Sequence, residues 1–269
     1  MAMPVSALYQ PYDVKGEVAI ITGASSGFGE AIAWRFAELG CKLVLIARRE
    51  ERLQALAAAL KEKYGAPCHV VAMDVRDIPA CEALLSKLPA EFAQPDILVN
   101  NAGLALGTAS AATNDLADMR VMLETNVLAV MALTKAALQA MLPRNKGHII
   151  NIGSTASHEA YPGGSGYNAS KFALGAYTTA ARHDLVDTNI RVTQISPGAV
   201  ETEFSLVRFK GDAARAAAVY AGMAPMSAAD IADNVVYAAT RPAHVQIADI
   251  IVTSVHQSGA KYRAQPASK

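Results

Sequence analysis

Seven short β-rich segments alternate with longer helical patterns along this 269-residue chain, and that alternation constrains the fold more than any other feature. The segments read EVAIIT, KLVLIA, HVVAM, DILVN, HIINI, IRVTQIS and DIIVTSV. Strands separated by helices predict a parallel sheet built from βαβ units. Because the segments are almost continuously apolar, we expect the sheet to be buried on both faces. The sequence therefore predicts one α/β domain over residues 1–269, with a doubly wound sheet of seven parallel strands and helices on both faces.

The helical patterns between these segments have recognisable ends. They cover residues 29–39, 50–63, 78–88, 116–142, 167–186 and 228–239. Gly40, Gly65 and Pro143 close three of them, and Ser227 is suited to cap the last. The segment from about 199 to 225 shows no buried-strand pattern and mixes FSLVRFKGD with an alanine-rich stretch. Long irregular segments often cover a site, so we expect a lid there.

Composition narrows the possible partners. The formal net charge is zero, and no Lys/Arg cluster is interleaved with aromatic residues, so we expect no nucleic-acid partner. Three cysteines without a CxxC spacing suggest reduced thiols rather than a disulfide framework. None of the six histidines stands three to five residues from another His or Cys, so we expect no metal site.

Apolar runs do not indicate a membrane protein. The longest, VMLETNVLAVMALTKAALQAML, is interrupted by Glu124 and Lys135. The first fifteen residues lack a basic start followed by an apolar stretch, which argues against a secretory signal. We therefore expect a cytoplasmic location, with a divergent organelle address as the alternative.

A glycine-rich turn, TGASSGFGE, follows the first predicted strand and opens the first predicted helix. In a Rossmann-type fold Gly23 would allow the tight turn, and Gly27 would let the backbone approach a pyrophosphate at the positive helix end. Gly29 would permit close packing of helix on strand. The alternative is an ordinary glycine-rich turn, but strand and helix fall where a dinucleotide site requires them.

The end of the second predicted strand indicates which dinucleotide is bound. An acidic residue at this point would bind the ribose 2′-hydroxyl of NAD. Here the sequence is LIARRE, with Ala47 in place of the acid and Arg48 and Arg49 after it. Two guanidinium groups suit a 2′-phosphate, so we predict NADP. Alternatively, both arginines simply begin a solvated helix.

Tyr167 and Lys171 stand four residues apart at the start of a predicted helix, in GSGYNASKFALGAY. Residues at this spacing are neighbours on a helix, so the ammonium could act on the phenol. An unperturbed tyrosine titrates near pH 10, and a cation beside it favours the phenolate. Alone the pair is a weak motif, because it also fits a chance pair on a solvated face.

Together these motifs resemble the short-chain dehydrogenase/reductase family from Val18 to about Val255. The shared pieces are TGASSGFG, the MDV that contains Asp74, NNAG at 100–103, Asn126, Ser154 in IINIGS, Tyr167 with Lys171, and SPGAVET at 196–202. Each is moderately specific, but all occur in the family's order and spacing. The resemblance implies an NADP-dependent oxidoreductase.

The resemblance also implies roles for four residues. Tyr167 would exchange a proton with the substrate oxygen, and Lys171 would lower the pKa of the phenol and hold the nicotinamide ribose. Ser154 would hydrogen-bond the substrate oxygen, and Asn126 would hold a water that links Lys171 to solvent. The alternatives are that Ser154 merely ends a strand and that Asn126 is a buried helical amide.

The cofactor contacts implied by the family are spread along the chain. Asp74 and Val75 would lie on the adenine side, with a strand-end turn as the alternative, and Asn100 could serve only to tie strands together. Pro197, Val200 and Thr202 would line the nicotinamide. The full set is Gly23, Ser25, Ser26, Gly27, Phe28, Arg48, Arg49, Asp74, Val75, Asn101, Ala102, Gly103, Tyr167, Lys171, Pro197, Gly198, Val200 and Thr202.

Within the family the chain is most similar to the NADP-dependent 3-hydroxy acid dehydrogenases, a group that includes serine 3-dehydrogenase. The pieces are GFGE, RREERLQ, LPAEF, DILVNNAGLALG, GHIINIGSTAS, TEFSLVRFKGD and RPAHV. This similarity implies substrates such as serine, or 3-hydroxypropionate and malonic semialdehyde. SPGAVETEF is about one residue shorter than the group's pattern, so the register of the lid stays open.

A carboxylate substrate needs a cation beside the reacting groups. We assign that role to Arg208, in the basic stretch VRFKGD of the expected lid, together with Ser154 and Tyr167 as substrate contacts. Lys210 is an alternative cation, and Arg208 could instead be a solvated lid residue or a subunit contact. His158 could face the same pocket, although a loop histidine without function fits equally.

Three other interpretations remain at this stage. The chain could be a broad carbonyl reductase or a sulfoacetaldehyde reductase with the same catalytic residues. It could also be a cofactor-sensing protein without turnover, although intact Ser154, Tyr167 and Lys171 argue against that. The family resemblance implies a homotetramer, with the long helices that begin near 116 and 167 packed across one interface.

Overall fold

The computed structural model describes residues 11–264, and all seven of its strands run parallel in one sheet. The strand order is β3-β2-β1-β4-β5-β6-β7, so the order reverses between β1 and β4. The strands are β1 (Val18–Thr22), β2 (Lys42–Ala47), β3 (Cys68–Ala72), β4 (Ile97–Asn100), β5 (Gly147–Ile152), β6 (Ile190–Pro197) and β7 (Asp249–Val252). The predicted Rossmann-type fold, a doubly wound sheet of seven parallel strands in a single domain, is confirmed.

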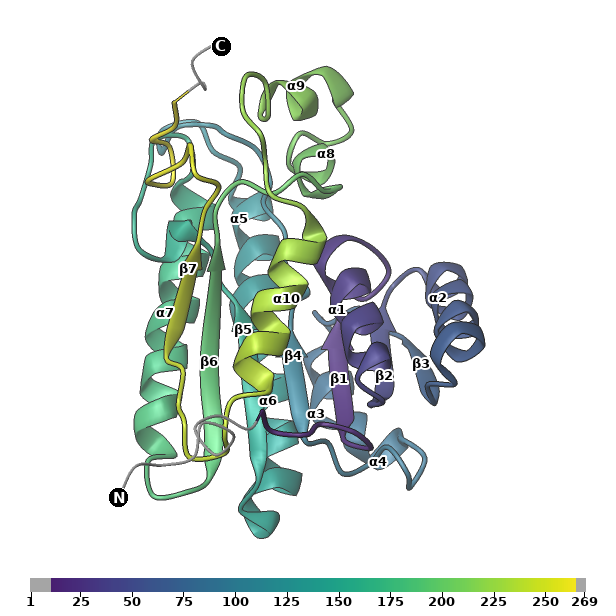
Figure 1. The fold of residues 1–269 in the computed structure, drawn as a ribbon. Helices are drawn as coiled ribbons and strands as arrows, with labels where there is room; N and C mark the ends of the chain where they lie inside the picture. The colour runs from purple at the N-terminus through teal and green to yellow at the C-terminus, as the bar shows by residue number, and fades with distance from the viewer. Residues whose placement is uncertain (1–10, 265–269) are drawn as a thin grey trace, which may run out of the picture.

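Helices cover both faces of the sheet, with α10 and α1 in front and α6 behind in the view of Figure 1. The helices are α1 (Gly27–Glu38), α2 (Glu50–Tyr64), α3 (Ile78–Glu82), α4 (Leu84–Lys87), α5 (Leu116–Leu123), the π-helix η2 (Glu124–Leu128), α6 (Ala129–Met141), α7 (Ser165–Asp184), α8 (Phe204–Arg208), α9 (Ala213–Ala218) and α10 (Ala228–Ala239). Short 3₁₀ turns occur at η3 (Leu142–Arg144) and η4 (Thr155–Ser157).

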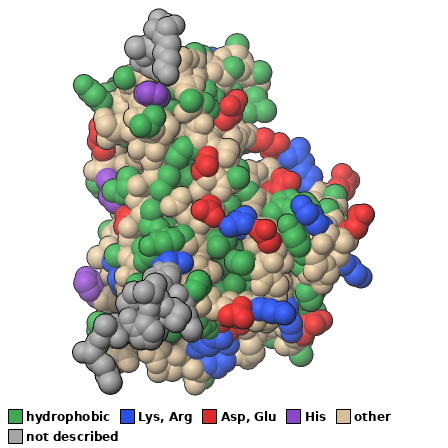
Figure 2. Space-filling view, viewed as in Figure 1, with side chains coloured by type: hydrophobic (Ala, Val, Ile, Leu, Met, Phe, Trp, Pro, Cys, Tyr) green, Lys and Arg blue, Asp and Glu red, His purple; other side chains and the backbone are tan. Residues whose placement is uncertain are grey.

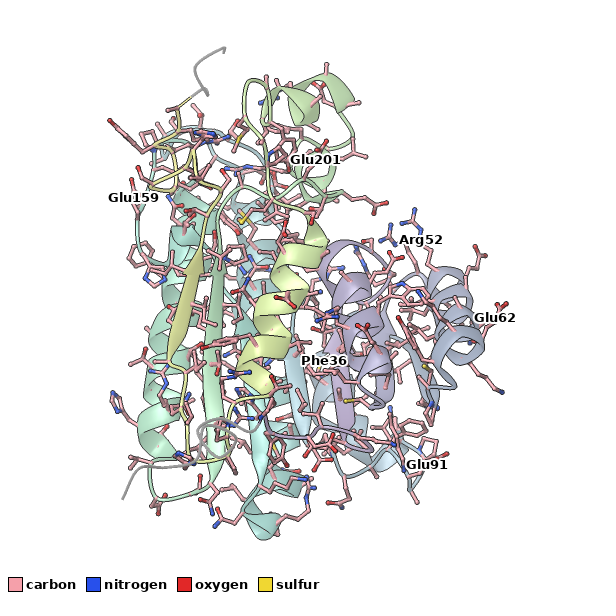
Figure 3. All side chains as sticks on the ribbon, viewed as in Figure 1. Phe36, Arg52, Glu62, Glu91, Glu159 and Glu201 are labelled. Carbon is pink, nitrogen blue, oxygen red and sulfur yellow. The ribbon has the colours of Figure 1, made fainter. Side chains whose placement is uncertain are left out.

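Each face of the sheet has its own hydrophobic core. Ile21 on β1 packs with the α1, α2 and α10 side of the sheet, where Phe36 and Ile231 are fully buried. Figure 3 shows Phe36 in the layer between α1 and the strands. The preceding residue on β1, Ile20, points to the opposite core, where α6 contributes Met141. This alternation across continuously apolar strands is why the sheet needs helices on both sides.

The expectation that every strand is buried on both faces is wrong for the two edges. β3 is only partly buried, and β7 alternates between exposed and intermediate positions, with Ile251 57% exposed. Each of these strands has a single neighbour in the sheet, so one of its edges is unpaired. Central strands β1, β4, β5 and β6 are buried along their whole length.

Two predicted helices are not continuous. Residues 78–88 form α3 and α4, which are separated at Ala83. The stretch 116–142 changes to a π-helix at Glu124–Leu128 before it continues as α6. By length and composition, Leu116–Arg144 could cross a membrane, although we expected Glu124 and Lys135 to interrupt its apolar run. However, 61% of its most apolar window is buried inside the fold. A core helix has this composition too.

The residues 199–225 form an excursion beyond the end of the sheet, which carries α8 and α9 (Figure 1). Its base is closed by a parallel bridge between Val200 and Met226. Inside it, the Tyr220 hydroxyl donates to the Val200 carbonyl at 2.9 Å and lies 2.7 Å from the Ser205 hydroxyl. The segment is therefore compact and internally bonded.

The surface seen in Figure 2 mixes charges of both signs, and no continuous basic surface is visible on that face. The three cysteines are free, and burial raises the pKa of Cys41 to about 12. Among residues 11–264 no group of three or more His, Cys, Asp or Glu side chains could hold a metal ion. Residues 1–10, on which our reading of the N-terminus depends, lie outside the described part of the chain.

Gly29 offers a test of the turn between β1 and α1. A methyl group there would lie 2.3 Å from the Gly23 carbonyl oxygen, so backbone would have to move. We expect Gly29→Ala to lower the free energy of unfolding by about 1–3 kcal/mol, measured by urea denaturation without cofactor. Gly175→Ala is the matched control, because its methyl would meet nothing closer than 3.6 Å within α7. It should be neutral or stabilising, and an equal loss in both variants would contradict this account.

Candidate active site

All seven strands present their carboxyl ends at one edge of the sheet, and the site is built there. Ligands of such sheets bind where the strand order reverses, which in this chain is between β1 and β4. The turn after β1 has Gly23 at φ +66° and Gly27 at φ +58°, backbone conformations that glycine adopts without strain. The loop after β4 packs directly against it, since the Asn101 amide donates to the Thr22 carbonyl at 2.8 Å.

A cleft of about 340 Å³ runs along this edge and fits a dinucleotide. The N-cap of α1, Ser26, makes no side-chain cap, so the first-turn N–H groups are available to an anion. The predicted cofactor residues that line the cleft are Gly23, Ser25, Ser26, Gly27, Phe28, Arg48, Arg49, Asp74, Val75, Asn101, Ala102, Gly103, Tyr167, Lys171 and Thr202. Pro197, Gly198 and Val200 line the adjoining cavity instead.

The arginines at the end of β2 match the chemistry of a 2′-phosphate. Ala47 and Arg48 line the cleft, and no acid stands at the end of the strand. Arg49 donates to the Ser25 hydroxyl at 3.1 Å and to the Ser26 hydroxyl at 2.7 Å, which holds its guanidinium beside the phosphate turn. The residues present therefore fit NADP.

Two of the predicted contacts have additional structural partners. The Asp74 carboxylate is paired with Arg76 at 2.6 Å, and hydrogen bonds from Arg76 lower the pKa of Asp74. The Asn100 amide donates to Asn151 Oδ1 at 2.9 Å and to Thr134 Oγ1 at 3.1 Å. Asn100 therefore ties β4 to β5 and α6, as the structural alternative held.

Tyr167 and Lys171 lie side by side on the first turns of α7, both buried against the cleft. The Lys171 Nζ atom donates to the Ile152 carbonyl at 2.8 Å and stands 5.8 Å from the centre of the Tyr167 ring. Burial lowers the pKa of Lys171 to about 8. A lysine that titrates so close to neutrality is typical of functional sites.

The pKa of the Tyr167 phenol is shifted in the opposite direction to the one that the sequence predicts. Burial raises the pKa of Tyr167, and a hydrogen bond with Ser154 and the charge of Arg208 only partly oppose this. The expected lowering by Lys171 is not found: removal of the ring from water dominates the shift, and the ammonium is bound to the Ile152 carbonyl. In this structure the phenol is neutral and can donate a proton.

Ser154 stands two residues after the end of β5 and caps the 3₁₀ turn η4. Its hydroxyl accepts from the Ala156 N–H at 3.1 Å, and the Ser157 hydroxyl accepts from the Ser154 N–H at 3.2 Å. This reciprocal capping fixes the Ser154 side chain beside Tyr167. The alternative that Ser154 merely ends a strand does not describe its position, because β5 ends at Ile152 and Ser154 caps the turn that follows while its hydroxyl faces the phenol.

Asn126 sits in the π-helix, a form of backbone often found at functional sites. Its Oδ1 accepts from the Leu104 N–H at 2.9 Å, while its Nδ2 donates to the Leu104 carbonyl at 2.8 Å and to Ser170 Oγ at 2.9 Å. All side-chain hydrogen-bonding groups are therefore engaged with protein. Asn126 thereby connects the loop after β4 to α7. Its contact on that helix is Ser170, which is three residues after Tyr167.

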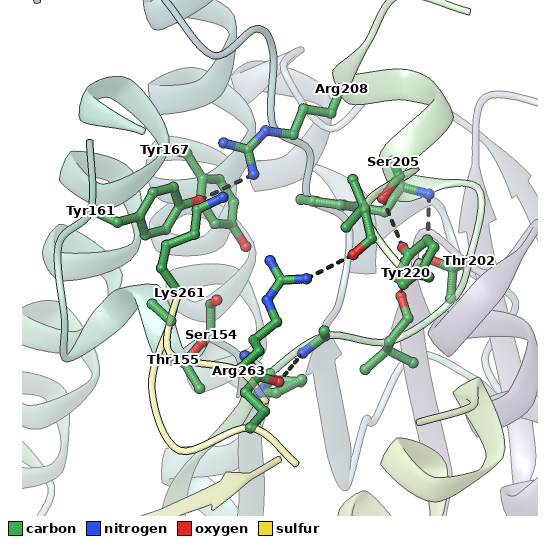
Figure 4. Close-up of a pocket in the computed structure, with 18 of the residues that line it drawn as sticks. Ser154, Thr155, Tyr161, Tyr167, Thr202, Ser205, Arg208, Tyr220, Lys261 and Arg263 are labelled. Atoms are coloured by element: carbon green, nitrogen blue, oxygen red, sulfur yellow. Dashed lines mark hydrogen bonds between the residues drawn. The ribbon is translucent and has the colours of Figure 1, made fainter. Parts of the chain in front are cut away.

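A second cavity, of about 550 Å³, opens beyond Ser154 and Tyr167 beneath the 199–225 segment. Arg208, the last residue of α8, reaches into it and donates to the Tyr161 hydroxyl at 3.1 Å (Figure 4). Its guanidinium carbon lies 5.8 Å from the centre of the Tyr167 ring. The buried Nη2 atom of Arg208 has no hydrogen-bond partner, so the guanidinium retains an unused donor.

The other candidate side chains lie elsewhere. The Lys210 ammonium pairs with Asp118 at 2.9 Å, and Lys210 is not among the residues that line the cavity. His158 Nε2 lies 3.1 Å from both Ser196 Oγ and Asp249 Oδ2, so it faces β6 and β7 rather than the cavity. Of the candidates for carboxylate recognition, only Arg208 lines the cavity.

Sequence reasoning missed several residues of the site. Tyr161, Glu203, Lys261 and Arg263 all line the cleft or the cavity. Lys261 and Arg263 follow β7, and chain that leaves the carboxyl end of a parallel strand emerges at the site edge. That topological signal was present in SGAKYR. Glu203 lies in the 199–225 segment and forms ion pairs with Arg49 and Arg52. The sequence pattern did not indicate these pairs.

The buried charge of Lys171 predicts a stability cost that depends on pH. Because the folded pKa of about 8 lies below the ordinary lysine pKa of 10.5, the folded state disfavours the ammonium, and this penalty is full below pH 8. We expect Lys171→Met to raise the free energy of unfolding at pH 7 by on the order of 1–3 kcal/mol, even though activity is lost. The gain should shrink as pH rises from 8 towards 10.5, where the unfolded chain also releases its proton.

Denaturant titrations of both proteins across that pH range would measure this. Lys135→Met is the matched control, since the Lys135 ammonium is exposed and paired with Glu82. The control should show no comparable gain, and a pH-independent effect of Lys171→Met would contradict the burial argument.

Comparisons with known proteins agree with this geometry. The chain matches the short chain dehydrogenase family over residues 17–212. It is 44% identical over 253 residues to the NADP-dependent 3-hydroxy acid dehydrogenase of Schizosaccharomyces pombe, covering 93% of this chain and 98% of that protein. It is 41% identical over 247 residues to sulfoacetaldehyde reductase 2 of Chromohalobacter salexigens, covering 91% and 97%.

The fold is also similar to that of a solved structure. The closed form of serine dehydrogenase complexed with NADP⁺ matches with a TM-score of 0.86 at 42% identity, covering 93% of this chain and 99% of that one. The phosphate turn, the paired Tyr167 and Lys171 and the arginines after β2 thus occur in a chain that belongs to the short-chain dehydrogenase/reductase family and is an NADP-dependent oxidoreductase.

Proposed function

We propose that this oxidoreductase interconverts a small 3-hydroxy acid and its 3-oxo form, with serine, or 3-hydroxypropionate and malonic semialdehyde, as the type substrates. The observation that carries the proposal is Arg208, whose buried Nη2 has no partner and whose guanidinium faces the same cavity as the Tyr167 ring. A guanidinium binds a carboxylate through strong, often bidentate, charge-assisted hydrogen bonds. Two similar proteins support this class of substrate. The relative in Schizosaccharomyces pombe is named as a 3-hydroxy acid dehydrogenase, and the similar solved structure is of a serine dehydrogenase.

The proton chemistry belongs to Tyr167. Bound NADP supplies the acceptor or donor of the hydride. In the reductive direction the phenol gives its proton to the carbonyl oxygen, and its raised pKa keeps that proton on the phenol until the oxygen takes it. In the oxidative direction the phenol must lose that proton first, and the positive charges of Lys171 and Arg208 favour the phenolate.

Ser154 and Asn126 support this step in different ways. We assign to Ser154 a hydrogen bond to the substrate oxygen, because capping by Ser157 holds it beside the phenol. Asn126 acts as a positioning residue, since its amide fixes the Leu104 backbone at the rim of the cleft and reaches Ser170 on α7. A proton relay through Asn126 would use its backbone, because its side chain is fully engaged.

The cofactor residues divide by chemistry. The turn Gly23–Gly27 and the N-terminus of α1 would hold the diphosphate, and Arg48 and Arg49 the 2′-phosphate. Asp74 and Val75 line the adenine end of the cleft, and Asn101, Ala102 and Gly103 its floor. Pro197, Gly198, Val200 and Thr202 would enclose the nicotinamide, with the 199–225 segment as the lid.

Reduction of sulfoacetaldehyde is the second candidate. The relative in Chromohalobacter salexigens carries that name, and a sulfonate would bind the same guanidinium as a carboxylate. A broad carbonyl reductase fits less well, because a cavity lined with cations disfavours neutral substrates. A sensor without turnover would have no use for the Tyr167 and Ser154 contact.

We further propose a cytoplasmic homotetramer. Leu123, Leu128 and Phe172, on α5, η2 and α7, are 41%, 49% and 43% exposed. Apolar side chains exposed on adjoining long helices are suited to packing against a second copy. Light scattering of the purified protein would test the assembly.

The substrate proposal predicts the outcome of a direct assay. With NADPH, malonic semialdehyde should be reduced with a kcat/KM well above that of propanal, which has no acid group. Tyr167→Phe should lower kcat by about 10²–10⁴-fold, because it removes the proton donor. Its NADPH affinity, followed by nucleotide fluorescence, should stay near that of the native protein. Reduction of neutral aldehydes at equal or greater efficiency would overturn the proposal.

Arg208 predicts how the enzyme tells acids from neutral substrates. We expect Arg208→Ala to raise KM for hydroxy acids by roughly 10–100-fold, the effect of losing a charge-assisted hydrogen bond, while KM for neutral alcohols changes little. Arg208→Lys should be intermediate, because charge remains but the planar fork is lost. Tyr161→Phe controls for the bond between Tyr161 and Arg208. Equal losses on acids and alcohols would remove Arg208 from this role.

A further inference from the structure

The cavity beyond Tyr167 carries more positive charge than one carboxylate requires. Besides Arg208 on the lid, Lys261 and Arg263 of the segment after β7 line the cavity from the other side. Figure 4 shows Arg208 and Arg263 reaching from opposite sides into the same space, above Ser154 and Thr155. The cavity, at about 550 Å³, would be shared by the substrate and the nicotinamide, so its charge and not its volume bears on the choice of substrate.

The three cations act on one another and lack acidic partners. The pKa of Lys261 is lowered by burial and then by the charges of Arg208 and Arg263. No carboxylate belongs to the lining of the cavity, and within residues 11–264 no ion pair is formed by Arg208, Lys261 or Arg263. Like charges gathered in a partly buried space repel, and an anion between them removes that cost.

The remaining contacts of these side chains are neutral. The Lys261 Nζ lies 4.8 Å from the centre of the Tyr161 ring, whose hydroxyl also binds Arg208. Arg263 Nη1 donates to the Val219 carbonyl at 2.7 Å and lies 3.5 Å from Met223 Sδ. Arg263 therefore links the C-terminal segment to the lid while its charge stays unneutralised.

The cofactor does not account for this charge. The groups that suit its phosphates, the N-terminus of α1 with Arg48 and Arg49, line the nucleotide cleft and not this cavity. Arg215 is a further cation of the lining, but it donates to Thr108 at 3.2 Å and stacks over Phe209 at 4.5 Å. Lys261 and Arg263 are thus left facing the substrate space.

We propose that Lys261 and Arg263 bind a second acidic group of the substrate, so that the preferred substrate is a 3-hydroxy acid with two acidic groups, of the dicarboxylate class. The inference rests on the proposed function, in which Arg208 binds the first carboxylate. In the oxidation, the hydride leaves the hydroxyl-bearing carbon for NADP⁺, and the hydroxyl proton leaves through Tyr167. The C–O single bond becomes a carbonyl, which yields the 3-oxo diacid, NADPH and one proton.

Compounds that share a secondary alcohol as the reacting centre and differ in the number of carboxylates test this. 3-Hydroxyglutarate has two carboxylates, each enantiomer of its monomethyl ester has one at almost the same size, and 3-hydroxybutyrate has one and is shorter. We expect kcat/KM with NADP⁺ to be at least about tenfold higher for the diacid than for either monoester, as one additional charge-assisted contact allows. Glutarate should likewise inhibit more strongly than butyrate.

Variants of the segment after β7 show whether Lys261 and Arg263 cause the preference for the diacid. Lys261→Gln and Arg263→Gln should each lower kcat/KM for 3-hydroxyglutarate about tenfold and leave the monoesters within about twofold. Arg263→Lys keeps the charge but not the guanidinium bond to Val219, so it separates charge from lid support. Lys210→Gln removes a lid cation outside the cavity and should not distinguish diacid from monoester.

The outcomes separate this inference from the proposed function. Equal kcat/KM for diacid and monoesters, or parallel losses on both in the Lys261 and Arg263 variants, overturns the second acid site while 3-hydroxy acid oxidation stands. Turnover of neutral alcohols with none of any acid overturns both. A selective loss on the diacid alone, with Lys210→Gln unchanged, supports the proposal.

Discussion

The common direction of the seven strands is the constraint on which the rest of this structure depends. Because every connection crosses back over the sheet, every carboxyl end opens on the same edge. Ser154 follows β5, Thr202 follows β6 and Lys261 follows β7, so segments distant in sequence converge there. α7 then brings Tyr167 and Lys171 to the edge from the face of the sheet. The nucleotide cleft and the cavity beyond Tyr167 therefore lie along the same edge of the sheet.

The parts of the site predictable from sequence are those fixed by local spacing. Tyr167 and Lys171 are one helical turn apart, and the glycines of the phosphate turn follow a strand directly, so each could be placed without knowing the fold. The π-turn at Asn126 could not, because it is an insertion of backbone into an otherwise regular apolar helix. The pairing of Glu203 with Arg49 and Arg52 joins residues some 150 apart, and no periodicity encodes it.

Electrostatic expectations failed where burial outweighed proximity. A lysine beside a tyrosine predicts a lowered phenol pKa, but both groups are removed from water and the ammonium is bound to Ile152. Desolvation therefore raises the pKa of the phenol and lowers that of the lysine to about 8. The site retains charges that the fold would be more stable without, which is common where catalysis sets the requirement.

Helix α8 connects the two ends of the site. Glu203, its N-cap, accepts from Arg49 at 2.9 Å and from Arg52 at 2.8 Å, and these hydrogen bonds lower the pKa of Glu203 to about 2. Figure 3 shows Arg52 at the end of α2 that faces the lid. Each pair is half exposed and adds little stability alone.

At its other end, α8 holds Arg208 over the substrate cavity. Five helical residues form a rigid link of about 7–8 Å, so a lid ordered on the arginines of the nucleotide side also presents Arg208 to the substrate side. One short helix therefore joins the arginines of the nucleotide cleft to the cavity beyond Tyr167.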